Sequence, residues 1–150
     1  MNSSLLFKDA TMKDYNFCHD LAKENMLDLV VKHWGSWNSE IYKKSFDPSR
    51  TKLIIYNNKK IGFFRTKTEN NILYIEDLQL LPSIKGKGLG TKTVKLIEDK
   101  AKKNNIKIIQ LSVFKDNLAF NFYKKLDYKI KEDIKHSYIM EKKLIQSLMK

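Results

Sequence analysis

The chain has 150 residues, of which 42% are hydrophobic, and its 29 basic and 17 acidic residues leave a formal net charge of +12. This length predicts one domain with one hydrophobic core. No apolar run approaches the roughly 20 residues that span a bilayer, and residues 1–5 lack the features of a secretory signal, so a soluble protein is expected. The single cysteine, Cys18, cannot form an internal disulfide, which favours a reducing cytoplasm.

The positive charge fits three kinds of anionic partner: nucleic acid, a membrane surface or a polyphosphate cofactor. The lysines are dispersed through every segment, which is typical of a solvated surface. Four of them nevertheless crowd one glycine-rich stretch: Lys85, Lys87, Lys92 and Lys95. Anionic ligands are expected to be attracted there.

The first third of the chain is predicted to be mainly helical. A short strand at 5–8 precedes apolar residues at helical spacing over 12–31, which predict one helix or two shorter ones. Residues 33–38 break this pattern, and a further helical piece at 39–46 is stopped by the Asp-Pro-Ser sequence at 47–49.

Runs of β-branched and aromatic residues then predict a three-stranded antiparallel meander. The strands are expected at 51–56, 60–66 and 72–80. The turns between them, at 57–59 and 69–71, contain asparagines, which suit tight hairpins.

The second half of the chain is predicted to continue as helix, strand, helix and two strands. A helix is expected at 89–103, with apolar residues on one arc and charged residues, including Glu98, on the other. The strand at 106–113 follows a helical crossover, so it should pair parallel to 72–80. A short helix through Ala119, Phe122, Tyr123 and Leu126 and strands at 128–134 and 137–144 complete the order. The fold class is thus α/β with a mixed sheet. Residues 145–150 are apolar enough to dock, either as an extension of the last strand, as a cover for a sheet edge or in a dimer contact.

A glycine-rich stretch follows the third strand of the meander: Leu80-Leu81-Pro82, and then Lys85-Gly86-Lys87-Gly88-Leu89-Gly90. Three of the five glycines lie here, between a strand and a helix, which indicates backbone N–H groups directed at a phosphate. The spacing lacks the Gly-Lys-Ser/Thr of a Walker loop. It also lacks the third Gly or Ala of a dinucleotide fingerprint, where Thr93 stands, and the acidic end of the next strand. Neither nucleotide hydrolysis nor NAD binding is therefore expected.

The stretch resembles the pyrophosphate loop of the GNAT superfamily of acyl-CoA-dependent N-acetyltransferases, which is Gln/Arg-x-x-Gly-x-Gly/Ala after a hydrophobic-x-Pro. Residues 113–128, Val-Phe-Lys-Asp-Asn-Leu-Ala-Phe-Asn-Phe-Tyr-Lys-Lys-Leu-Asp-Tyr, are similar to the family's Asn…Ala…Tyr-x-x-x-Gly-Phe segment. Lys85 replaces Gln or Arg and keeps a phosphate donor without the bidentate fork of Arg. Asp127 replaces a Gly, but Asp tolerates left-handed backbone. The resemblance implies a GNAT-like fold, with a mostly antiparallel sheet, one parallel strand pair and flanking helices.

By this resemblance the cofactor is acetyl-CoA. Its pyrophosphate would be bound by backbone N–H groups at the start of the 89–103 helix, in residues Lys85, Gly86, Lys87, Gly88, Leu89, Gly90 and Thr91. Its pantetheine arm would pair with the strand end at Leu78, Gln79 and Leu80, where a backbone N–H could also bond the thioester oxygen. Asn117 would lie near this arm, although capping of the following helix explains it equally well.

Two residues match catalytic positions of the family. Tyr123 would protonate the CoA sulfur, and the alternative for it is core packing; the neighbouring Phe122, expected to be the buried aromatic, favours the acid role. Glu76 would accept the amine proton directly or through water, and the alternative is a solvent-facing or salt-bridged carboxylate. Asp77, on the opposite face of the strand, is the carboxylate expected to be structural.

The acceptor site is expected in the helical start of the chain. Trp34 and Trp37 lie in the break between helices and could form aromatic walls for an amine, with Asp28, or alternatively Glu24, holding a cation. The alternative for the tryptophans is closure of the core.

The expected function is an N-acetyltransferase that transfers an acetyl group from acetyl-CoA to a primary amine, in a small molecule or a protein, by direct attack. No metal, membrane or nucleic-acid partner is expected, and a homodimer is one possible assembly. The alternative is a noncatalytic acyl-CoA sensor or interaction module that keeps the loop without the chemistry.

Overall fold

A computed structural model describes residues 5–145, whose contacts divide the chain into two compact units. Unit 1 comprises Met1–Thr66 and Asp77–Gly90, and unit 2 comprises Lys67–Glu76 and Thr91–Lys150. The single domain expected from the sequence stays a prediction.

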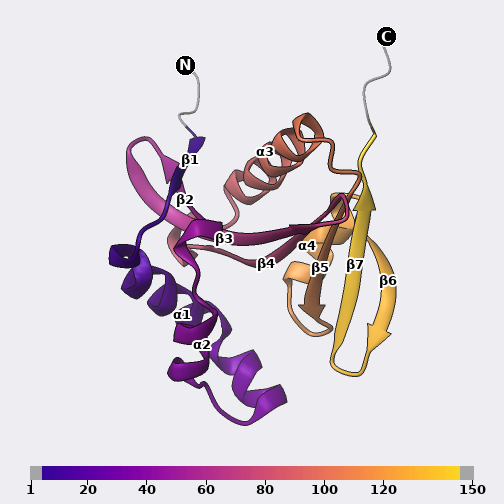
Figure 1. The fold of residues 1–150 in the computed structure, drawn as a ribbon. Helices are drawn as coiled ribbons and strands as arrows, with labels where there is room; N and C mark the ends of the chain where they lie inside the picture. Colours follow the sequence, from indigo (N-terminus) through magenta and orange to yellow (C-terminus); the bar gives the residue numbers. More distant parts are fainter. Residues whose placement is uncertain (1–4, 146–150) are drawn as a thin grey trace. The chain divides into compact units, whose positions relative to one another are not determined.

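The described residues form an α/β fold with a seven-stranded mixed sheet in the order β1-β2-β3-β4-β5-β7-β6 (Figure 1). The strands are β1 (Leu5–Asp9), β2 (Thr51–Tyr56), β3 (Lys59–Glu69), β4 (Ile72–Leu80), β5 (Ile108–Phe114), β6 (Lys129–Ile134) and β7 (Ser137–Lys143). The helices are α1 (Tyr15–Trp34), α2 (Ser39–Ser45), α3 (Leu89–Lys103) and α4 (Ala119–Lys125), with short 3-10 turns η1 (Met12–Asp14), η2 (Pro48–Arg50) and η3 (Pro82–Ile84). The predicted parallel pair is confirmed: Ile72–Ile75 of β4 pair with Ile108–Leu111 of β5.

The two predicted hairpin turns are made by pairs of asparagines. Asn57 and Asn58 have φ of 50° and 68°, and Asn70 and Asn71 have φ of 51° and 66°. Two successive left-handed residues make a turn whose twist matches that of the flanking strands, and asparagine adopts this conformation more readily than most residues. Each turn is one residue shorter than predicted, because β3 begins at Lys59 and continues to Glu69.

The first helices of unit 1 begin and end at clear capping signals. Thr11 and Asp14 form a capping box at η1, and Asn38 Oδ1 accepts the N–H groups of Glu40 and Ile41 at the start of α2. The prediction that α1 ends near residue 31 is wrong. The helix continues to Trp34 because Gly35 is the residue that turns left-handed, with φ 92°.

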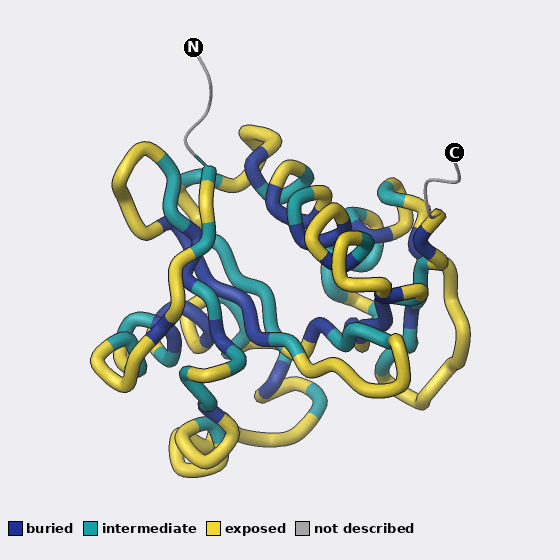
Figure 2. The backbone as a smooth tube through the Cα atoms, turned by 45° about the horizontal axis from the view of Figure 1, so that its top comes forward, coloured by how far each residue is buried: buried dark blue, intermediate teal, exposed yellow. Residues whose placement is uncertain are grey.

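Unit 1 has its own core, made by α1, β2 and β3 with residues that lie beside them. Its buried members are Ala10, Cys18, Leu21, Ala22, Phe46, Leu53 and Phe63. Figure 2 shows buried residues along β2 and β3. Both strands are rich in β-branched and aromatic residues, which favour strand structure.

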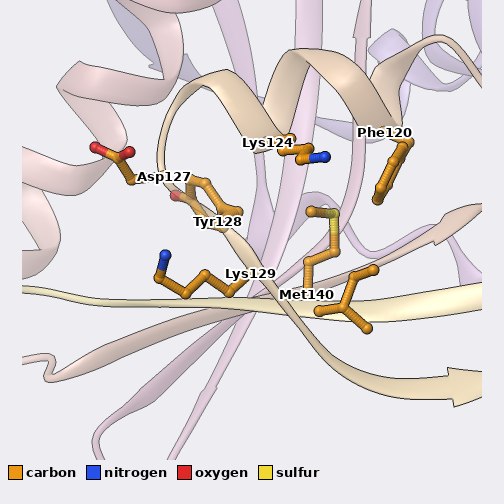
Figure 3. A pocket seen from close by; sticks show the side chains of 7 residues that line it. Phe120, Lys124, Asp127, Tyr128, Lys129 and Met140 are labelled. Carbon is orange, nitrogen blue, oxygen red and sulfur yellow. The ribbon is translucent and has the colours of Figure 1, made fainter.

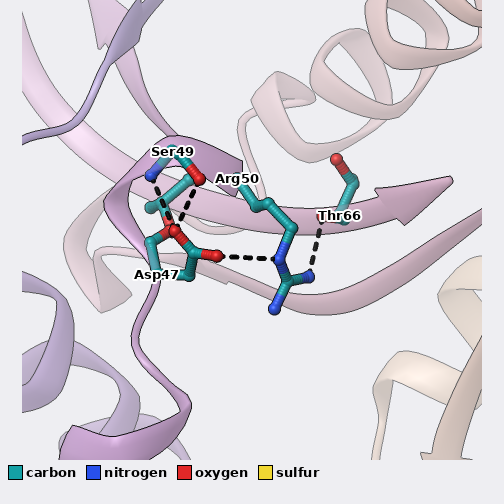
Figure 4. A network of polar contacts seen from close by, with 5 residues as sticks. Asp47, Ser49, Arg50 and Thr66 are labelled. Atoms are coloured by element: carbon teal, nitrogen blue, oxygen red, sulfur yellow. Dashed lines mark hydrogen bonds and ion pairs between the residues drawn. The ribbon is translucent and has the colours of Figure 1, made fainter.

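A polar network holds the connection between α2 and β2 in unit 1 (Figure 4). Asp47 accepts hydrogen bonds from the Ser49 N–H at 3.0 Å and from Arg50 Nε at 3.2 Å. Arg50 Nη1 in turn donates to the carbonyl oxygen of Thr66 at 3.0 Å. The Asp-Pro-Ser sequence that stops α2 thus also ties the entry of β2 to β3.

In unit 2, α3 buries the predicted apolar residues but also one charged residue. Val94, Ile97 and Ala101 are buried, as expected, and so is Leu89, the first residue of the helix, which belongs to unit 1. The placement of Glu98 on the solvent arc is wrong, because this residue is only 6% exposed. Its carboxylate accepts the Tyr128 hydroxyl at 2.8 Å and Lys142 Nζ at 3.1 Å. These two partners, from the β6–β7 side of the unit, satisfy the Glu98 carboxylate, which the helical pattern predicted to be exposed to solvent.

The end of α4 leads into β6 through a left-handed residue. Asp127 has φ 72°, so the aspartate fills the position where the family pattern has glycine. The next residue, Tyr128, is 1% exposed. At the end of the chain Leu144 is buried and Ile145 is exposed, and the expected docking of the last residues falls on 146–150, outside the described residues.

Candidate active site

The exit of β4 in unit 1 is fixed by hydrogen bonds at both ends of one peptide group. The Leu80 carbonyl oxygen accepts a hydrogen bond from Asn25 Nδ2 at 2.9 Å. The Leu81 N–H, on the other side of the same peptide, donates to the Ile61 carbonyl oxygen at 2.8 Å. Asn25 lies on α1 and Ile61 on β3. The strand end where pantetheine is expected is thus held from two elements.

The glycine loop that follows is an open turn leading into α3. Gly86 and Gly88 have φ of 84° and 79°, and a Cβ atom added to either would meet nothing within 4 Å. Glycine is therefore favoured at both positions by the left-handed backbone conformation, and the space beside the backbone is open. The loop continues directly into the 15-residue α3. The N–H groups of the first turn of an α-helix point out of its N-terminus. Open backbone at a helix N-terminus fits a pyrophosphate group.

The sequence did not point to Gly62, on β3, as part of this site. A Cβ atom at Gly62 would overlap the Gln79 carbonyl oxygen and would lie 2.9 Å from Leu80 Cδ2. Glycine is needed here because the backbones of β3 and β4 approach each other too closely for any side chain. The only available signal was a glycine inside a strand pattern, which indicates close backbone approach.

The two neighbouring carboxylates on β4 have different surroundings. Glu76 is exposed, whereas Asp77 is partly buried and accepts Gln79 Nε2 at 2.9 Å and the Tyr42 hydroxyl at 3.4 Å. Burial raises the pKa of Asp77, against the opposing effects of the Gln79 hydrogen bond and the Arg65 charge. Alternation along the strand therefore gives Glu76 an exposed position and Asp77 a partly buried one.

Aromatic side chains of α1, α2 and the connection between them pack together in unit 1. The Trp37 ring stacks on Tyr42 with centroids 5.8 Å apart, and its Nε1–H donates to His19 Nε2 at 3.1 Å. His19 Nε2 must then be an acceptor, and Nδ1, 3.0 Å from Asp20 Oδ1, carries the proton. Trp37 packs against the core of unit 1, which is the alternative that the sequence left open.

The other two predicted acceptor residues lie on the solvent side of α1. Trp34, the last residue of the helix, is 69% exposed, and Asp28 is also exposed. The prediction that Trp34 lies in a loop is wrong, since it lies in the last turn of α1. Its exposed ring is nevertheless accessible to a ligand.

Tyr123 lies in unit 2 on α4 and is 7% exposed. Its ring contacts Phe122 at 5.0 Å and Tyr128 at 5.4 Å between centroids. The expectation that Phe122 would be the buried aromatic is wrong: Phe122 is half-buried and Tyr123 is the buried one. Asn117 was expected to cap this helix, but the N-cap residue of α4 is Leu118, which makes no side-chain cap bond. The Asn117 Oδ1 atom instead accepts the Ala119 N–H at 2.9 Å from one position before the cap.

A hollow of about 320 Å³ opens between α4, which carries Tyr123, and the β6–β7 hairpin (Figure 3). It is lined by Phe120, Lys124, Asp127, Tyr128, Lys129, Ile130 and Met140. None of the predicted site residues is among them. Burial raises the pKa of the Tyr128 hydroxyl, and the Glu98 carboxylate beside it adds to this effect.

Residues 5–145 contain no group of three or more His, Cys, Asp or Glu side chains placed to hold a metal ion. Over the same residues, no helix has the length and apolar character needed to cross a membrane.

Comparison with known proteins finds one family and many solved structures. The family model described as "Acetyltransferase (GNAT) family" matches residues 12–128. The PaiA N-acetyltransferase of Thermoplasma acidophilum, solved in complex with coenzyme A, aligns with a TM-score of 0.75 and 20% identity, covering 93% of this chain and 99% of that one. The ribosomal-protein-S18-alanine N-acetyltransferase of Escherichia coli aligns with a TM-score of 0.73 and 14% identity, covering 95% and 96%.

A third structure, N-acetylglutamate synthase from Neisseria gonorrhoeae complexed with coenzyme A and N-acetyl-glutamate, aligns with a TM-score of 0.71 and 13% identity. The match covers 97% of this chain and 36% of that protein. At these identities the three structures share their fold with this chain.

Proposed function

The chain belongs to the GNAT acetyltransferase family, and from this premise we propose that it transfers an acetyl group from acetyl-CoA to a primary amine by direct attack of the amine. Acetyl-CoA is the cofactor of this family. The observation that carries the proposal is the glycine loop, in which two left-handed glycines leave open backbone at the start of α3.

The donor site is proposed to use mainly backbone groups. N–H groups within residues 86–91 would hold the pyrophosphate, since the Lys85 N–H already donates to the Pro82 carbonyl at 3.3 Å. The exposed side chains of Lys85 and Lys87 would add positive charge. The pantetheine arm would lie along Leu78–Leu80. For Asn117, in unit 2, a contact with this arm rests on the family resemblance alone.

When bound, acetyl-CoA supplies an activated acyl carbon and a thiolate leaving group. Tyr123 is proposed to donate its phenolic proton to the sulfur, because the ordinary pKa values of tyrosine and a thiol, about 10 and 8.5, permit this transfer. Glu76 is proposed to accept the proton of the amine, directly or through water, and its exposure allows an amine to reach it.

Direct attack is supported by the state of the cysteine. Cys18 is the single cysteine of the chain, and it is buried in the core of unit 1. Burial raises the pKa of its thiol to about 12, so it holds its proton at neutral pH. A thiol in this state cannot carry the acetyl group between donor and acceptor.

The acceptor is proposed to bind at the solvent side of α1, near Asp28 and Trp34, with Trp37 as a further aromatic candidate. An ammonium group could be held by the carboxylate and by an aromatic face. The similar structures include one named for a protein substrate and one complexed with N-acetyl-glutamate, so their fold is compatible with either class of amine. A cytoplasmic location is proposed from the single reduced cysteine.

The donor site is tested by the change in melting temperature on addition of acetyl-CoA. Gly88→Glu places an anion where the pyrophosphate is expected and should abolish the rise. Gly35→Glu is the matched control, because Gly35 also has a left-handed φ and open space beside it but lies outside the loop. This control should keep the rise. A wild-type protein with no shift, or a Gly88→Glu variant that keeps it, would contradict the proposed site.

The reaction is tested by following release of the CoA thiol with a panel of polyamines, amino acids and peptides with free N-termini. Tyr123→Phe should lower turnover while leaving the acetyl-CoA melting shift intact. Turnover by no amine, combined with a normal melting shift, would favour the noncatalytic sensor.

A further inference from the structure

An asparagine in the middle of α1 calls for an explanation, because asparagine is a poor residue for a helix interior. Asn25 is half-buried, and its Nδ2 donates to the Leu80 carbonyl oxygen at 2.9 Å and to Gln79 Oε1 at 3.1 Å. Both acceptors lie at the end of β4, more than 50 positions along the chain. The amide thus connects the first helix to the strand end proposed to hold pantetheine.

The hydrogen bonds continue from Asn25 in a chain whose direction is determined at both ends. The Leu80 carbonyl can only accept, so Asn25 must present its amide nitrogen there. Asp77 also accepts, so Gln79 must present Nε2 to it and Oε1 to Asn25. No flip of either amide preserves these bonds. The chain Asn25–Gln79–Asp77 therefore specifies one arrangement of the β4 end.

The same peptide is held from its opposite side. The Leu81 N–H donates to Ile61, and the absence of a side chain at Gly62 admits the Gln79 carbonyl. With β3 on one side and Asn25 on the other, the backbone over residues 79–81 has little freedom to rotate.

We propose that Asn25 is a positioning residue for the acyl donor: it orients the β4 end so that its backbone can pair with the pantetheine arm. This role rests on the proposed acetyl-CoA site. Asn25 makes no contact with the reacting atoms in this proposal and acts through the Leu80 peptide.

The effect of Asn25 is confined to the pantetheine part of the site because the glycine loop has bonds of its own. The Ile84 N–H donates to the Leu81 carbonyl at 3.1 Å, and the Lys85 N–H donates to the Pro82 carbonyl at 3.3 Å. These bonds close η3 without Asn25. Loss of the asparagine should therefore spare the pyrophosphate subsite.

The test compares two ligands by isothermal titration calorimetry. Acetyl-CoA reaches both subsites, whereas 3′-phosphoadenosine 5′-diphosphate keeps the pyrophosphate and lacks the pantetheine arm. Asn25→Asp is isosteric but turns an acceptor toward the Leu80 carbonyl. Asn16→Asp is the matched control, because it adds the same charge at an exposed position of the same helix.

Asn25→Asp should weaken acetyl-CoA binding about tenfold, as expected for loss of one hydrogen bond to the backbone, and should change binding of the diphosphate less than twofold. Asn16→Asp should leave both unchanged. If Asn25→Asp does not fold, Asn25→Ala replaces it, since alanine favours the helix and also removes the donor.

Three results would overturn the role. Unchanged acetyl-CoA binding in the Asn25 variant would show that the peptide needs no positioning. Equal weakening of both ligands would indicate a general loosening of unit 1. A wild-type protein that binds neither ligand would overturn the proposed function itself, and this role with it.

Discussion

The two units each bury a polar network, and the two networks differ in charge and in what they hold. In unit 1, Asn25, Gln79 and Asp77 form a chain of amides ending on one carboxylate, which the Tyr42 hydroxyl also contacts. In unit 2, the Glu98 carboxylate is paired with the Lys142 ammonium and accepts the Tyr128 hydroxyl.

The unit 1 network orients the backbone at the end of β4, whereas the unit 2 network holds secondary-structure elements together. The unit 1 chain joins a main-chain carbonyl at the proposed donor site to the Asp77 carboxylate through the neutral amides of Asn25 and Gln79. The unit 2 network joins α3 to Tyr128 and β7, and none of its members is a predicted site residue. Substitutions should therefore affect ligand binding in unit 1 and stability in unit 2.

The largest effect is expected at Glu98. Glu98→Ala leaves Lys142 and the Tyr128 hydroxyl without their shared acceptor, and should lower the free energy of unfolding by about 3 kcal/mol in urea titrations. The estimate is at the low end for buried pairs because the Lys142 side chain is 25% exposed. Asp99→Ala, an exposed acidic residue on the same helix, should cost little. Equal losses of unfolding free energy in Glu98→Ala and Asp99→Ala would contradict a stabilising role for the Glu98 network.

The next effect is expected at Gly62. Gly62→Ala forces β3 and β4 apart at the Gln79 carbonyl and should cost about 2 kcal/mol, the range for overpacking a close contact. It should also weaken acetyl-CoA binding, since the Leu80 peptide would shift. Gly35→Ala, which meets no neighbour but has a left-handed φ, should cost about 1 kcal/mol and leave binding unchanged. Normal acetyl-CoA affinity in Gly62→Ala would show that the donor site does not depend on Gly62.

The charge in the unit 1 network should produce a pH dependence. Burial raises the folded-state pKa of Asp77 above its ordinary 3.8, so the folded protein holds this proton more tightly than the unfolded chain. The stability contributed by Asp77 is fully present below pH 3.8 and is lost as the pH rises through the folded-state pKa, by at most about 1.4 kcal/mol per pH unit.

Asp77→Asn should remove this slope, so the free energy of unfolding of wild type relative to the variant should fall as the pH is raised above 3.8 and then level off. Thermal unfolding across a pH series measures this difference. The opposite slope would mean that Arg65 and the hydrogen bonds outweigh burial.

The smallest effect is expected at Tyr42. Its hydroxyl lies 3.4 Å from Asp77 Oδ2, a long hydrogen bond, and the ring stays stacked on Trp37 without it. Tyr42→Phe should cost about 0.5 kcal/mol and leave acetyl-CoA binding unchanged, because the Asn25–Gln79–Asp77 chain does not depend on it. A tenfold loss of affinity in this variant would extend the positioning network to α2.

The sequence by itself determined the features that depend on neighbouring residues. Helical and strand periodicity predicted the element order, paired asparagines predicted the hairpins, and the spacing of Gly86 and Gly88 predicted an open loop before α3. These follow from φ preferences and from repeats of two or 3.6 residues, which are properties of adjacent positions. The family resemblance also rested on such local motifs.

Only the tertiary structure decided which side chains meet across the chain. Asn25 reaches Gln79, 54 positions away, and Glu98 reaches Lys142, 44 positions away. Gly62 is needed only because the Gln79 carbonyl comes against it, and Tyr123 is buried where Phe122 was expected to be. The local sequence pattern predicts that a charged or amide side chain faces solvent. Folding can bury such a side chain when a distant residue replaces water as its hydrogen-bond partner.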